Sequence, residues 1–540
     1  MTVNRLYYGD NLDILQRYGR DETIDLVYLD PPFNSNQNYN VLFAEQDGSR
    51  STAQIKAFGD TWKWDKQSAR AYQEVVEAGG KVSQTMQAFR QLLGNSDMLA
   101  YLAMMAPRLV ELYRVLKPTG SLFLHCDTTA SHYLKILLDA IFDPRNFRNE
   151  ITWRRYGAHN DVGQGSKHFG RVHDILLFYT KSDLLTWEQI FTPLDSKYVE
   201  ATYRYIEPET GRRFTTTPLT GPGGAAKGNP VFEWKGHTRA WRYNRDTMER
   251  LDREGRLYYS RTGYVRQKLY LGESKGTPVQ DVWDDIPSLS GAHAERLGYP
   301  TQKPLALLER IIKATTKEGD MVLDPFCGCG TTIAAAQHLN RHWIGIDITH
   351  IAISLIKTRL LDTYSDSITK TYEVKGEPTT HSEAIALAEQ DKYQFQWWAL
   401  GLVGARRIDE KKGADQGIDG RLIFHDEGAE GKSKQIILSV KGGHTNVKDI
   451  RDLRGVIERE NAEIGVLLTL QEPTQPMIKE AAAADFYQSP WGKHPRLQIL
   501  TIADLLDGKH IDMPPVRQVN ITFKKATKVK GEQPETPTLL

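Results

Sequence analysis

Short apolar segments alternate with helical segments in the first part of the chain and again in its second half. Residues 24–29 read IDLVYL, an apolar run typical of a buried strand, and residues 98–116 have the apolar spacing of a helix. Further apolar strands are expected at residues 321–326 and 342–348. Strands that alternate with helices predict a largely parallel sheet with helices on both faces. The fold class that we expect is therefore α/β.

The alternation is interrupted between residues 157 and 294, where no long periodic helix is present. This interruption predicts an insert that divides one sheet between two parts of the sequence. A chain of 540 residues also needs more than one domain, because single cores rarely grow beyond about 300 residues. In chain order, we predict a first core part at 1–156, the insert at 157–294, a second core part at 295–364, a polar linker at 365–391, a second α/β domain at 392–515 and a loose tail at 516–540.

The composition is that of a globular protein, with 40% hydrophobic and 25% charged residues, and no apolar run approaches the ~18 residues of a membrane span. The N-terminal segment has neither the basic nor the apolar region of a signal peptide. We therefore expect a cytoplasmic protein with no membrane partner. The cysteines Cys126, Cys327 and Cys329 are too few and too close for a structural zinc site or a disulfide framework, so we expect them to be reduced.

A glycine turn joins a strand to a helix at residues 324–339, DPFCGCGTTIAAAQHL. Gly328 and Gly330 let the backbone approach a ligand closely, and Asp347 ends the next strand, where an acid can accept hydrogen bonds from ribose hydroxyls. The turn lacks the GK[ST] sequence of a phosphate-binding loop, so a nucleoside without phosphates fits better than a nucleotide. S-adenosylmethionine is such a ligand. The alternative is that these glycines only make a tight connection in an ordinary α/β domain.

Asp30, Pro31, Pro32 and Phe33 follow the first apolar strand directly. The exocyclic amine of adenine or cytosine is a poor nucleophile because its lone pair is delocalised into the ring. A catalyst must therefore accept hydrogen bonds from the NH2 group and hold it toward a methyl donor. Asp30 and a proline carbonyl can accept those bonds, the prolines fix the loop, and Phe33 offers a face for stacking on a flipped base. The alternative for Asp30 alone is a turn or capping carboxylate.

Together with the sequence YPTQKPLALLERII, these motifs resemble the amino-methyltransferases of bacterial restriction-modification systems. The order, with the Asp-Pro-Pro-Phe motif first and the glycine turn last, is similar to their β class over residues 5–155 and 296–360. The resemblance implies a Rossmann-like S-adenosylmethionine-dependent core with an inserted target-recognition region, acting on double-stranded DNA. Asp before Pro-Pro favours N6 of adenine as the target, and N4 of cytosine stays open.

The resemblance also implies roles for single residues, with Asp30, Pro31, Pro32 and Phe33 as catalytic. The residues expected to bind S-adenosylmethionine are Asp10, Asp30, Gln302, Lys303, Asp324, Phe326, Gly328, Gly330, Thr331 and Asp347. Two positions depart from the family pattern. Cys329 stands where many relatives have Ser, and Phe33 stands where Tyr is commoner, which keeps the stacking face but removes a hydroxyl.

Residues 211–270 of the insert contain ten Arg and three Lys against five acidic residues. Arginines contact phosphates and read guanine edges, and aromatic side chains can fill the gap that a flipped base leaves. The segment therefore predicts a DNA-reading surface, with a solvated basic surface as the alternative. Its interleaved aromatic residues are Trp234, Trp241, Tyr243, Tyr258, Tyr259 and Tyr264.

Asp419 lies 22 residues before Lys441, which ends an apolar strand after Ser439. An acid and a strand-borne lysine can hold Mg2+ and orient a water against a phosphodiester. Residues 392–508 resemble the Mrr-like branch of the PD-(D/E)XK restriction endonucleases. This resemblance implies Asp419 as the metal ligand and Asp419, Ser439 and Lys441 as catalytic, with Asp415 as a helper or a turn residue.

Two positions of this segment depart from the nuclease pattern. Ser439 stands where an acid or Gln is usual, and Gln394 and Gln396 stand where a Glu is often found. We favour a fused restriction-modification protein whose methyltransferase and Mg2+-dependent endonuclease share one recognition insert. The alternative is a solitary methyltransferase whose C-terminal domain only binds DNA or a partner. A methyltransferase for RNA or protein amines fits the basic insert less well, and homodimer formation is left open.

Overall fold

The computed structural model describes residues 4–32, 63–157, 167, 169–221, 223–260, 263–290, 293–297, 299, 301–405, 417–424 and 434–514. The chain forms two compact units, one made of Met1–Glu188 with Asp281–Leu540 and the other of Gln189–Gln280. Within the described ranges, none of the helices is both long enough and apolar enough to span a membrane.

The larger unit is built on one mixed sheet, whose strands are β1 (Asn4–Tyr8), β2 (Ile24–Leu29), β3 (Leu116–Cys126), β4 (Phe147–Arg154), β5 (His173–Thr180), β14 (Val282–Trp283), β15 (Met321–Asp324), β16 (His342–Asp347) and β17 (Tyr372–Lys375). Their order is β14-β4-β5-β3-β2-β15-β16-β1-β17. β5 is antiparallel to β3 and β4, and the other neighbouring pairs are parallel. The expected α/β core, divided in sequence by an insert, is confirmed.

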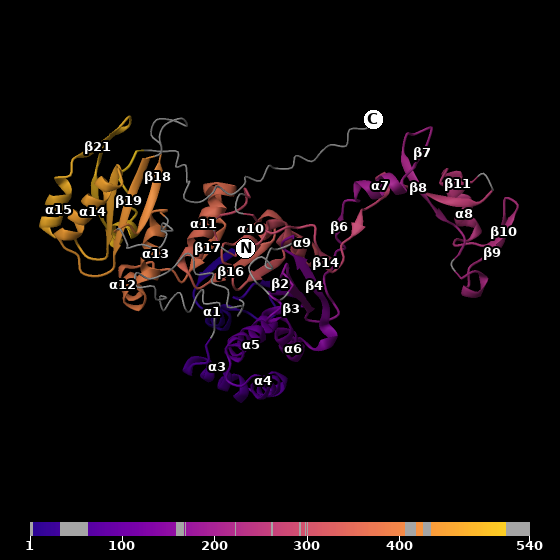
Figure 1. The fold of residues 1–540 in the computed structure, drawn as a ribbon, viewed down its shortest axis with the longest axis horizontal. Coiled ribbons are helices and arrows are strands. Elements are labelled where there is room, and N and C mark those ends of the chain that lie inside the picture. The colour runs from indigo at the N-terminus through magenta and orange to yellow at the C-terminus, as the bar shows by residue number, and fades with distance from the viewer. Residues whose placement is uncertain are drawn as a thin grey trace. The chain divides into compact units, whose positions relative to one another are not determined.

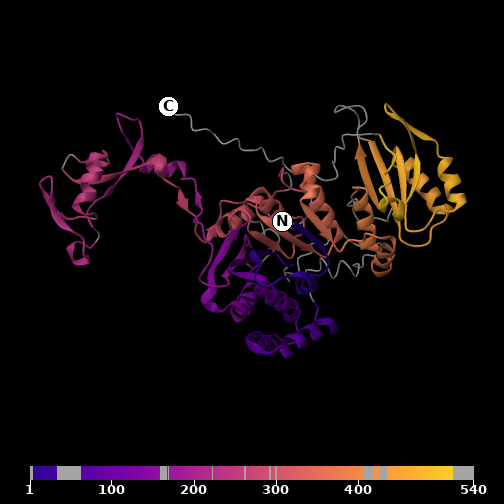
Figure 2. The same cartoon turned by 180° about the vertical axis from the view of Figure 1, so that it is seen from behind.

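Helices cover both faces of this sheet (Figure 1, Figure 2). One face carries α1 (Asn11–Tyr18), α5 (Asp97–Val115) and α6 (Ser131–Phe142), with α3 (Lys66–Glu77) and α4 (Gly80–Leu93) packed on α5 and α6. The other face carries α9 (Leu305–Thr315), α10 (Thr331–His338) and α11 (His350–Tyr364). The helix predicted for residues 98–116 is α5, and it begins after Ser96, whose hydroxyl accepts a hydrogen bond from the Leu99 amide.

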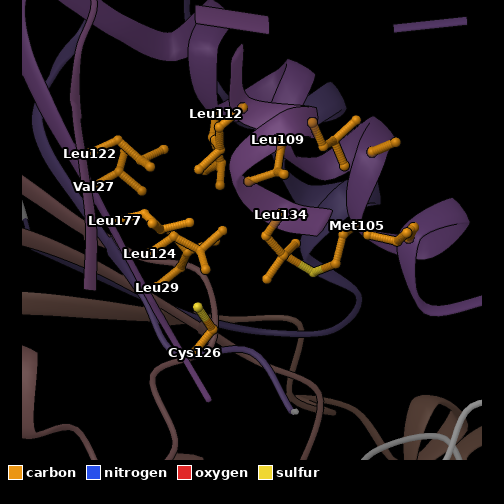
Figure 3. Close-up of a cluster of buried hydrophobic side chains, with 14 of the residues drawn as sticks. Val27, Leu29, Met105, Leu109, Leu112, Leu122, Leu124, Cys126, Leu134 and Leu177 are labelled. Carbon is orange, nitrogen blue, oxygen red and sulfur yellow. The ribbon is translucent and has the colours of Figure 1, made fainter. Parts of the chain in front are cut away.

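β2 is buried along its whole length because it lies inside a sheet with helices on both faces. Successive side chains of a strand point to opposite faces, so Val27 and Leu29 share one face and Tyr28 lies on the other. Full burial of one such leucine stabilises the fold by about 2 kcal/mol. Figure 3 shows the cluster that β2, β3 and β5 form with α5 and α6, namely Val27, Leu29, Leu122, Leu124, Cys126, Leu177, Met105, Leu109, Leu112 and Leu134.

The separate small unit, Gln189–Gln280, is shorter than the predicted insert of residues 157–294. The difference arises because β5 and β14 belong to the large sheet. β5 has the apolar sequence HDILLFYT and is almost entirely buried between β3 and β4. Its strand pattern was obscured in the sequence by the aperiodic segments on either side.

The predicted linker at residues 365–391 contains regular structure over much of its length. A short 3-10 helix, η6 (Asp366–Lys370), precedes β17, and α12 (His381–Gln390) follows it. β17 pairs with β1 as an edge strand of the large sheet and is only half-buried. Because β17 has only four residues, with half-buried and exposed side chains in alternation, its sequence YEVK gives little hydropathy signal.

The small unit contains short antiparallel sheets around a compact apolar cluster. Its elements are β6 (Phe191–Thr192), α7 (Ser196–Thr202), β7 (Tyr205–Ile206), β8 (Arg213–Pro218), β9 (Val231–Trp234), β10 (His237–Ala240), α8 (Arg245–Arg253), β11 (Leu257–Tyr259), β12 (Val265–Tyr270) and β13 (Thr277–Pro278). Trp234, Trp241, Met248 and Leu251 contribute to its core. β7 with β8, β9 with β10 and β11 with β12 are hairpin pairs, while the pairs β8 with β12 and β6 with β13 join segments far apart in the sequence.

The C-terminal module, residues 381–514, has a sheet with the strand order β18-β19-β20-β23. Its strands are β18 (Gly420–Phe424), β19 (Lys434–Lys441), β20 (Ile464–Thr469) and β23 (Leu497–Thr501), with a hairpin of β21 (Phe486–Ser489) and β22 (Gly492–Pro495). Besides α12, the helices are α13 (Lys392–Leu402), α14 (Val447–Arg459), α15 (Gln475–Ala482) and α16 (Ile502–Leu506). Separate apolar clusters involve α12 with α13 and α14 with α15, which confirms the predicted second α/β pattern.

Candidate functional site

Carboxylates follow or end four neighbouring parallel strands of the large sheet. Asp10 comes two residues after β1, Asp30 directly follows β2, and Asp324 and Asp347 are the last residues of β15 and β16. These strands are adjacent in the order β2-β15-β16-β1. Parallel strands end at the same edge, where open α/β sheets bind their ligands. The fold therefore gathers at one edge acids that are as much as 337 positions apart in the chain.

The glycine turn closes the strand edge between β15 and α10. Gly328 and Gly330 have positive φ values of 47° and 71°, in the region that favours glycine. A Cβ added at Gly330 would lie 2.6 Å from Cγ1 of Ile356, so the packing against α11 also excludes a side chain there. The Gly328 amide donates a hydrogen bond of 2.9 Å to Oδ2 of Asp347. The turn and the end of β16 are thus joined directly.

Asp347 is held in a fixed orientation by its own loop. Its Oδ1 accepts hydrogen bonds from the backbone amide and the hydroxyl of Thr349, at 2.9 and 2.8 Å. Burial raises the pKa of its carboxyl group. Asp347 is only partly buried, so its carboxylate can also accept a hydrogen bond from a ligand at this edge, such as a ribose hydroxyl.

Asp324 has a different environment from Asp347, since it is only 3% exposed. Its carboxylate accepts hydrogen bonds from the Thr332 hydroxyl, at 2.5 Å, and from the Phe326 amide, at 3.0 Å. Burial raises its pKa to about 7, and the negative charges of Asp30 and Asp347 act in the same direction. This geometry places Asp324 as a support for the glycine turn and the start of α10.

Asp10 begins α1, where its side chain accepts a hydrogen bond of 2.9 Å from the Leu12 amide. It also forms an ion pair of 2.6 Å with Arg108 of α5. Arg108 donates to Asn11, and Asn11 in turn donates to the Pro325 carbonyl at 2.7 Å. Arg108 could not be singled out from the sequence, because α5 otherwise has the pattern of an apolar packing helix.

Asp30 is paired with Lys303, which precedes α9 in the chain. Both side chains are largely buried, with 15% of Asp30 and 13% of Lys303 exposed. Pro31 and Pro32 follow Asp30 without regular secondary structure, and Phe33 lies outside the described residues. The structure thus brings two motifs from opposite ends of the core into direct contact.

The remaining predicted cofactor residues lie around the same turn. The side chain of Gln302 bonds its own loop, donating to the Glu295 carbonyl at 2.7 Å and accepting from the Leu297 amide at 2.8 Å. Thr331 is buried and accepts a hydrogen bond of 3.2 Å from Arg359. Phe326 is partly buried against the main apolar cluster. These residues shape the turn, and their contacts do not assign a ligand to them.

Three aromatic residues near this edge were not singled out from the sequence. Tyr8 stacks on His350 with ring centroids 3.6 Å apart. Tyr299 packs beside the glycine turn, where its ring would lie 3.2 Å from a Cβ on Gly328. Tyr28 forms a buried hydrogen bond with His125. All of them lie in apolar or aperiodic segments, where a single tyrosine gives no signal of its neighbours.

The basic segment of the small unit differs in part from the predicted DNA-reading surface. Trp234 and Trp241 are core residues, 6% and 1% exposed, so the interpretation of these two as DNA-facing was wrong. Glu273, which lies outside the basic segment, pairs with both Arg212 and Arg256. Sequence counting could not reveal either fact, because side-chain direction and pairing depend on the hairpins.

Tyr264 is the clearest exposed aromatic of this segment. It is 49% exposed, and the guanidinium carbon of Arg239 lies 4.4 Å from its ring centroid. A flat ring beside a guanidinium is a group that can stack on a base or contact a phosphate. The small unit therefore has on its surface an aromatic and guanidinium pair of a kind that can contact a nucleic acid.

The predicted metal site of the C-terminal module does not fit a divalent cation. Asp419 accepts hydrogen bonds at Oδ1 from the Gln396 amide group and at Oδ2 from Ser439 Oγ, at 3.2 Å, and the Val440 amide, at 2.6 Å. Among the described residues, no group of three His, Cys, Asp or Glu side chains could hold a metal. Protein donors thus surround the carboxylate that was expected to hold Mg2+.

The other residues considered for that site differ in their positions relative to Asp419. Gln394 faces elsewhere, since its Oε1 accepts a hydrogen bond of 3.1 Å from the His350 amide. Lys441 ends β19, two residues beyond Ser439. Asp415 lies outside the described residues. The expected Mg2+ site is therefore corrected to a carboxylate that organises the hydrogen bonds of α13 and β19.

Two family models match the chain. The model described as DNA methylase matches residues 24–358, more than half of the chain. The model described as NACHT-associated inactive restriction endonuclease 1 matches residues 392–507. The match confirms that the C-terminal module resembles restriction endonucleases. The description of that family as inactive agrees with the hydrogen bonds that both carboxylate oxygens of Asp419 already accept.

Two known relatives match about half or more of the chain. The type II methyltransferase M.EcaI from Enterobacter cloacae is 32% identical over 264 residues, which cover 48% of this chain and 57% of that protein. The Mod subunit of the type III restriction-modification enzyme StyLTI from Salmonella typhimurium is 27% identical over 353 residues, covering 62% of this chain and 50% of that protein. The chain thus spans less than two thirds of the length of either relative.

Solved structures show weaker likenesses. The M1.HpyAVI–SAM complex has a TM-score of 0.31 and 15% identity, and covers 66% of this chain and 98% of that one. The cytosine-N4-specific PvuII DNA methyltransferase has a TM-score of 0.33 and 15% identity, with coverage of 69% and 95%. At these scores, neither likeness bears on the fold or the activity of this chain.

Proposed function

The chain belongs to the DNA methylase family, and on that premise we propose that it transfers a methyl group from S-adenosylmethionine to N6 of adenine in double-stranded DNA. The observation that carries the proposal is the meeting of Asp30 with the glycine turn at one sheet edge. Asp30 follows β2, and the turn follows the adjacent strand β15. A group that binds an amine thus lies next to a turn that admits a ligand.

S-adenosylmethionine fits the residues at this edge. Gly330 keeps the turn free of a side chain, and the partly exposed carboxylate of Asp347 can accept a hydrogen bond from a ribose hydroxyl. The Lys303 ammonium can receive the carboxylate of the methionine moiety. When bound, this cofactor supplies an electrophilic methyl group on a sulfonium.

The chain's own part in the reaction is to hold the amine. The Asp30 carboxylate accepts a hydrogen bond from the NH2 group of a flipped base, and the carbonyl of Pro31 can accept the second. This orients the nitrogen lone pair toward the donor. A strong base is not needed, because the N–H proton becomes acidic once the methyl group is transferred.

Adenine is proposed over cytosine because the motif begins with Asp. The small unit, with Arg239 and Tyr264 on its surface, is proposed to read the DNA sequence. The C-terminal module is proposed to bind DNA or a protein partner without cutting DNA, since protein groups already occupy the oxygens of Asp419. This corresponds to the solitary methyltransferase considered from the sequence.

The test uses purified full-length protein, labelled S-adenosylmethionine and unmethylated genomic DNA. Mass spectrometry of the digested nucleosides separates N6-methyladenine from N4-methylcytosine. N6-methyladenine in the product is expected. N4-methylcytosine would overturn the choice of base, and the absence of any methylated nucleoside would overturn the proposed function. Intact DNA after incubation with Mg2+ is expected as well.

A further inference from the structure

A chain of buried polar side chains runs beneath Asp30 across three strands. Tyr28 of β2, His125 of β3 and Asp174 of β5 are 2%, 0% and 1% exposed. The Tyr28 hydroxyl lies 2.9 Å from Nδ1 of His125, and Nε2 of His125 lies 3.0 Å from Oδ2 of Asp174. These groups lie on the sheet face opposite to the apolar cluster of Figure 3, to which Val27 and Leu29 belong.

The hydrogen-bond pattern assigns a direction to this chain. A carboxylate only accepts, so the Nε2 proton of His125 is donated to Asp174. In the tautomer with that proton on Nε2, Nδ1 accepts from the Tyr28 hydroxyl. Burial, followed by the nearby charge of Asp30, raises the pKa of the Tyr28 hydroxyl well above its ordinary value, so this group stays a neutral donor.

Asp174 is also charged at neutral pH. Burial pushes the pKa of its carboxyl group upward, but the hydrogen bond from His125 and the positive charges of Lys303 and Arg155 outweigh that effect, so the pKa is lowered. Nε of Arg155, just after β4, lies 3.2 Å from Oδ1 of Asp174. Lys303 therefore acts on Asp174 as well as on its ion-pair partner Asp30.

The register of the sheet links this chain to the strand end that carries Asp30. β2 and β3 are parallel, with Tyr28 opposite Phe123 and Leu29 opposite Leu124. His125 therefore lies one residue beyond the last recorded pair, beside the point where β2 ends. Tyr28 precedes Asp30 by two residues, so both lie on the same side of the chain while it stays extended.

We propose that the Tyr28–His125–Asp174 chain positions Asp30 for methyl transfer, with His125 as the central positioning residue. The inference rests on the proposed function, because Asp30 must first be the group that holds the amine. Burying three polar groups is unfavourable unless they are bonded to one another, and an apolar trio would fill this space without that requirement. The hydrogen bonds among Tyr28, His125 and Asp174 instead hold the end of β2 in place against β3 and β5.

Hydrogen bonds that position Asp30 affect the rate of methyl transfer and not the binding of S-adenosylmethionine or DNA. A displacement of about 1 Å at a reacting group can lower the rate by about 100-fold. Tyr28→Phe removes one hydroxyl and keeps the ring. It is expected to lower kcat by roughly 10- to 100-fold, while KM for S-adenosylmethionine and for DNA stays within about twofold.

Tyr179→Phe is the matched control. Tyr179 is a fully buried tyrosine of β5 whose hydroxyl donates to Asp139 at 2.6 Å, on the opposite sheet face from His125. It also loses a buried hydroxyl bonded to an acceptor, so a similar loss in Tm is expected, with kcat unchanged. The comparison separates a positioning effect from a general loss of stability.

The experiment measures kcat, both KM values and Tm for the full-length parental protein, Tyr28→Phe and Tyr179→Phe. If Tyr28→Phe does not fold, His125→Asn replaces it, since its shorter amide can accept from Tyr28 but does not reach Asp174. A loss of kcat in Tyr28→Phe that does not occur in Tyr179→Phe supports the proposal. A parental kcat, or an equal loss in Tyr179→Phe, overturns it. A parental protein without methyl transfer contradicts the proposed function instead.

Discussion

The Lys303 ammonium forms an ion pair with the carboxylate of Asp30, although 272 residues separate them in the chain. The pair links the loop after β2 to the segment that leads into α9. It is largely shielded from water, since 15% of Asp30 and 13% of Lys303 are exposed. A shielded pair of this kind is stronger than a surface pair, because water screens it less.

Replacement of this lysine is expected to slow methyl transfer. Lys303→Met leaves the Asp30 carboxylate without its cation in a nearly buried position, where a charge-assisted bond contributes about 1.5–3 kcal/mol. We expect kcat/KM to fall on the order of 10-fold or more. Steady-state kinetics on DNA would measure it, with the exposed Lys317→Met as the control. Equal kinetics for the two variants would show that the ion pair has no part in the reaction.

Gly330→Ala is expected to weaken binding of S-adenosylmethionine. The new Cβ would lie 2.6 Å from Ile356, and the positive φ of 71° adds strain of roughly 1–2 kcal/mol for any residue with a Cβ. Gly319→Ala is the control for backbone strain alone. Gly319 also has a positive φ, 82°, but no atom lies within 4 Å of the added Cβ. Calorimetry should show a loss of affinity for Gly330→Ala only. Unchanged affinity would place the ligand away from this turn.

Asp324 should make the stability of the core depend on pH. Its pKa is about 7 in the fold, above the value of about 3.9 in an unfolded chain, so the unfolded state releases the proton first as pH rises. Its stabilising contribution is therefore fully present below about pH 4 and is lost as pH rises to about 7, at roughly 1.4 kcal/mol per pH unit.

Asp324→Asn removes this titration, while its amide oxygen can accept from the Phe326 amide and its NH2 group can donate to the Thr332 hydroxyl. The difference in free energy of unfolding between the parental protein and the variant should decrease up to about pH 7 and then stay constant. Denaturant unfolding over this pH range measures it. A difference that does not change with pH would mean that Asp324 is ionised throughout.

Asp419→Ala is expected to destabilise the C-terminal module without changing methyl transfer. The donors of Gln396, Ser439 and Val440 lose their shared acceptor, and each buried unsatisfied group costs about 1–3 kcal/mol. Calorimetric unfolding should therefore show a lower Tm. Mg2+ should leave the Tm of the parental protein unchanged, and an increase with Mg2+ would restore the metal site that the hydrogen bonds exclude.

The sequence predicts the methyltransferase-like core well because its information is local. The apolar run of β2, the glycines of the turn and the spacing of α5 are each encoded within about 20 residues. Asp30, Asp324 and Asp347 could be placed at one edge because parallel strands end together. What could not be predicted depends on contacts between distant segments.

Three examples show this limit. Arg108 gives no signal in an apolar helix, yet it joins Asp10 to Asn11. Trp234 was expected on a DNA-reading surface because it lies among arginines, but it packs into the core of the small unit. The acid and lysine spacing around Asp419 suggested a metal site, and only the fold reveals that a glutamine and a backbone amide occupy its oxygens.

The measurement that tests the central claim most directly is methyl transfer by Asp30→Ala, followed by mass spectrometry of N6-methyladenine in DNA, with S-adenosylmethionine binding measured on the same preparation. The carboxylate holds the amine and not the sulfonium donor, so methyl transfer should fall by about 100-fold or more while the donor still binds. Parental rates in Asp30→Ala would contradict the account, because the reaction would then not depend on the carboxylate at the end of β2.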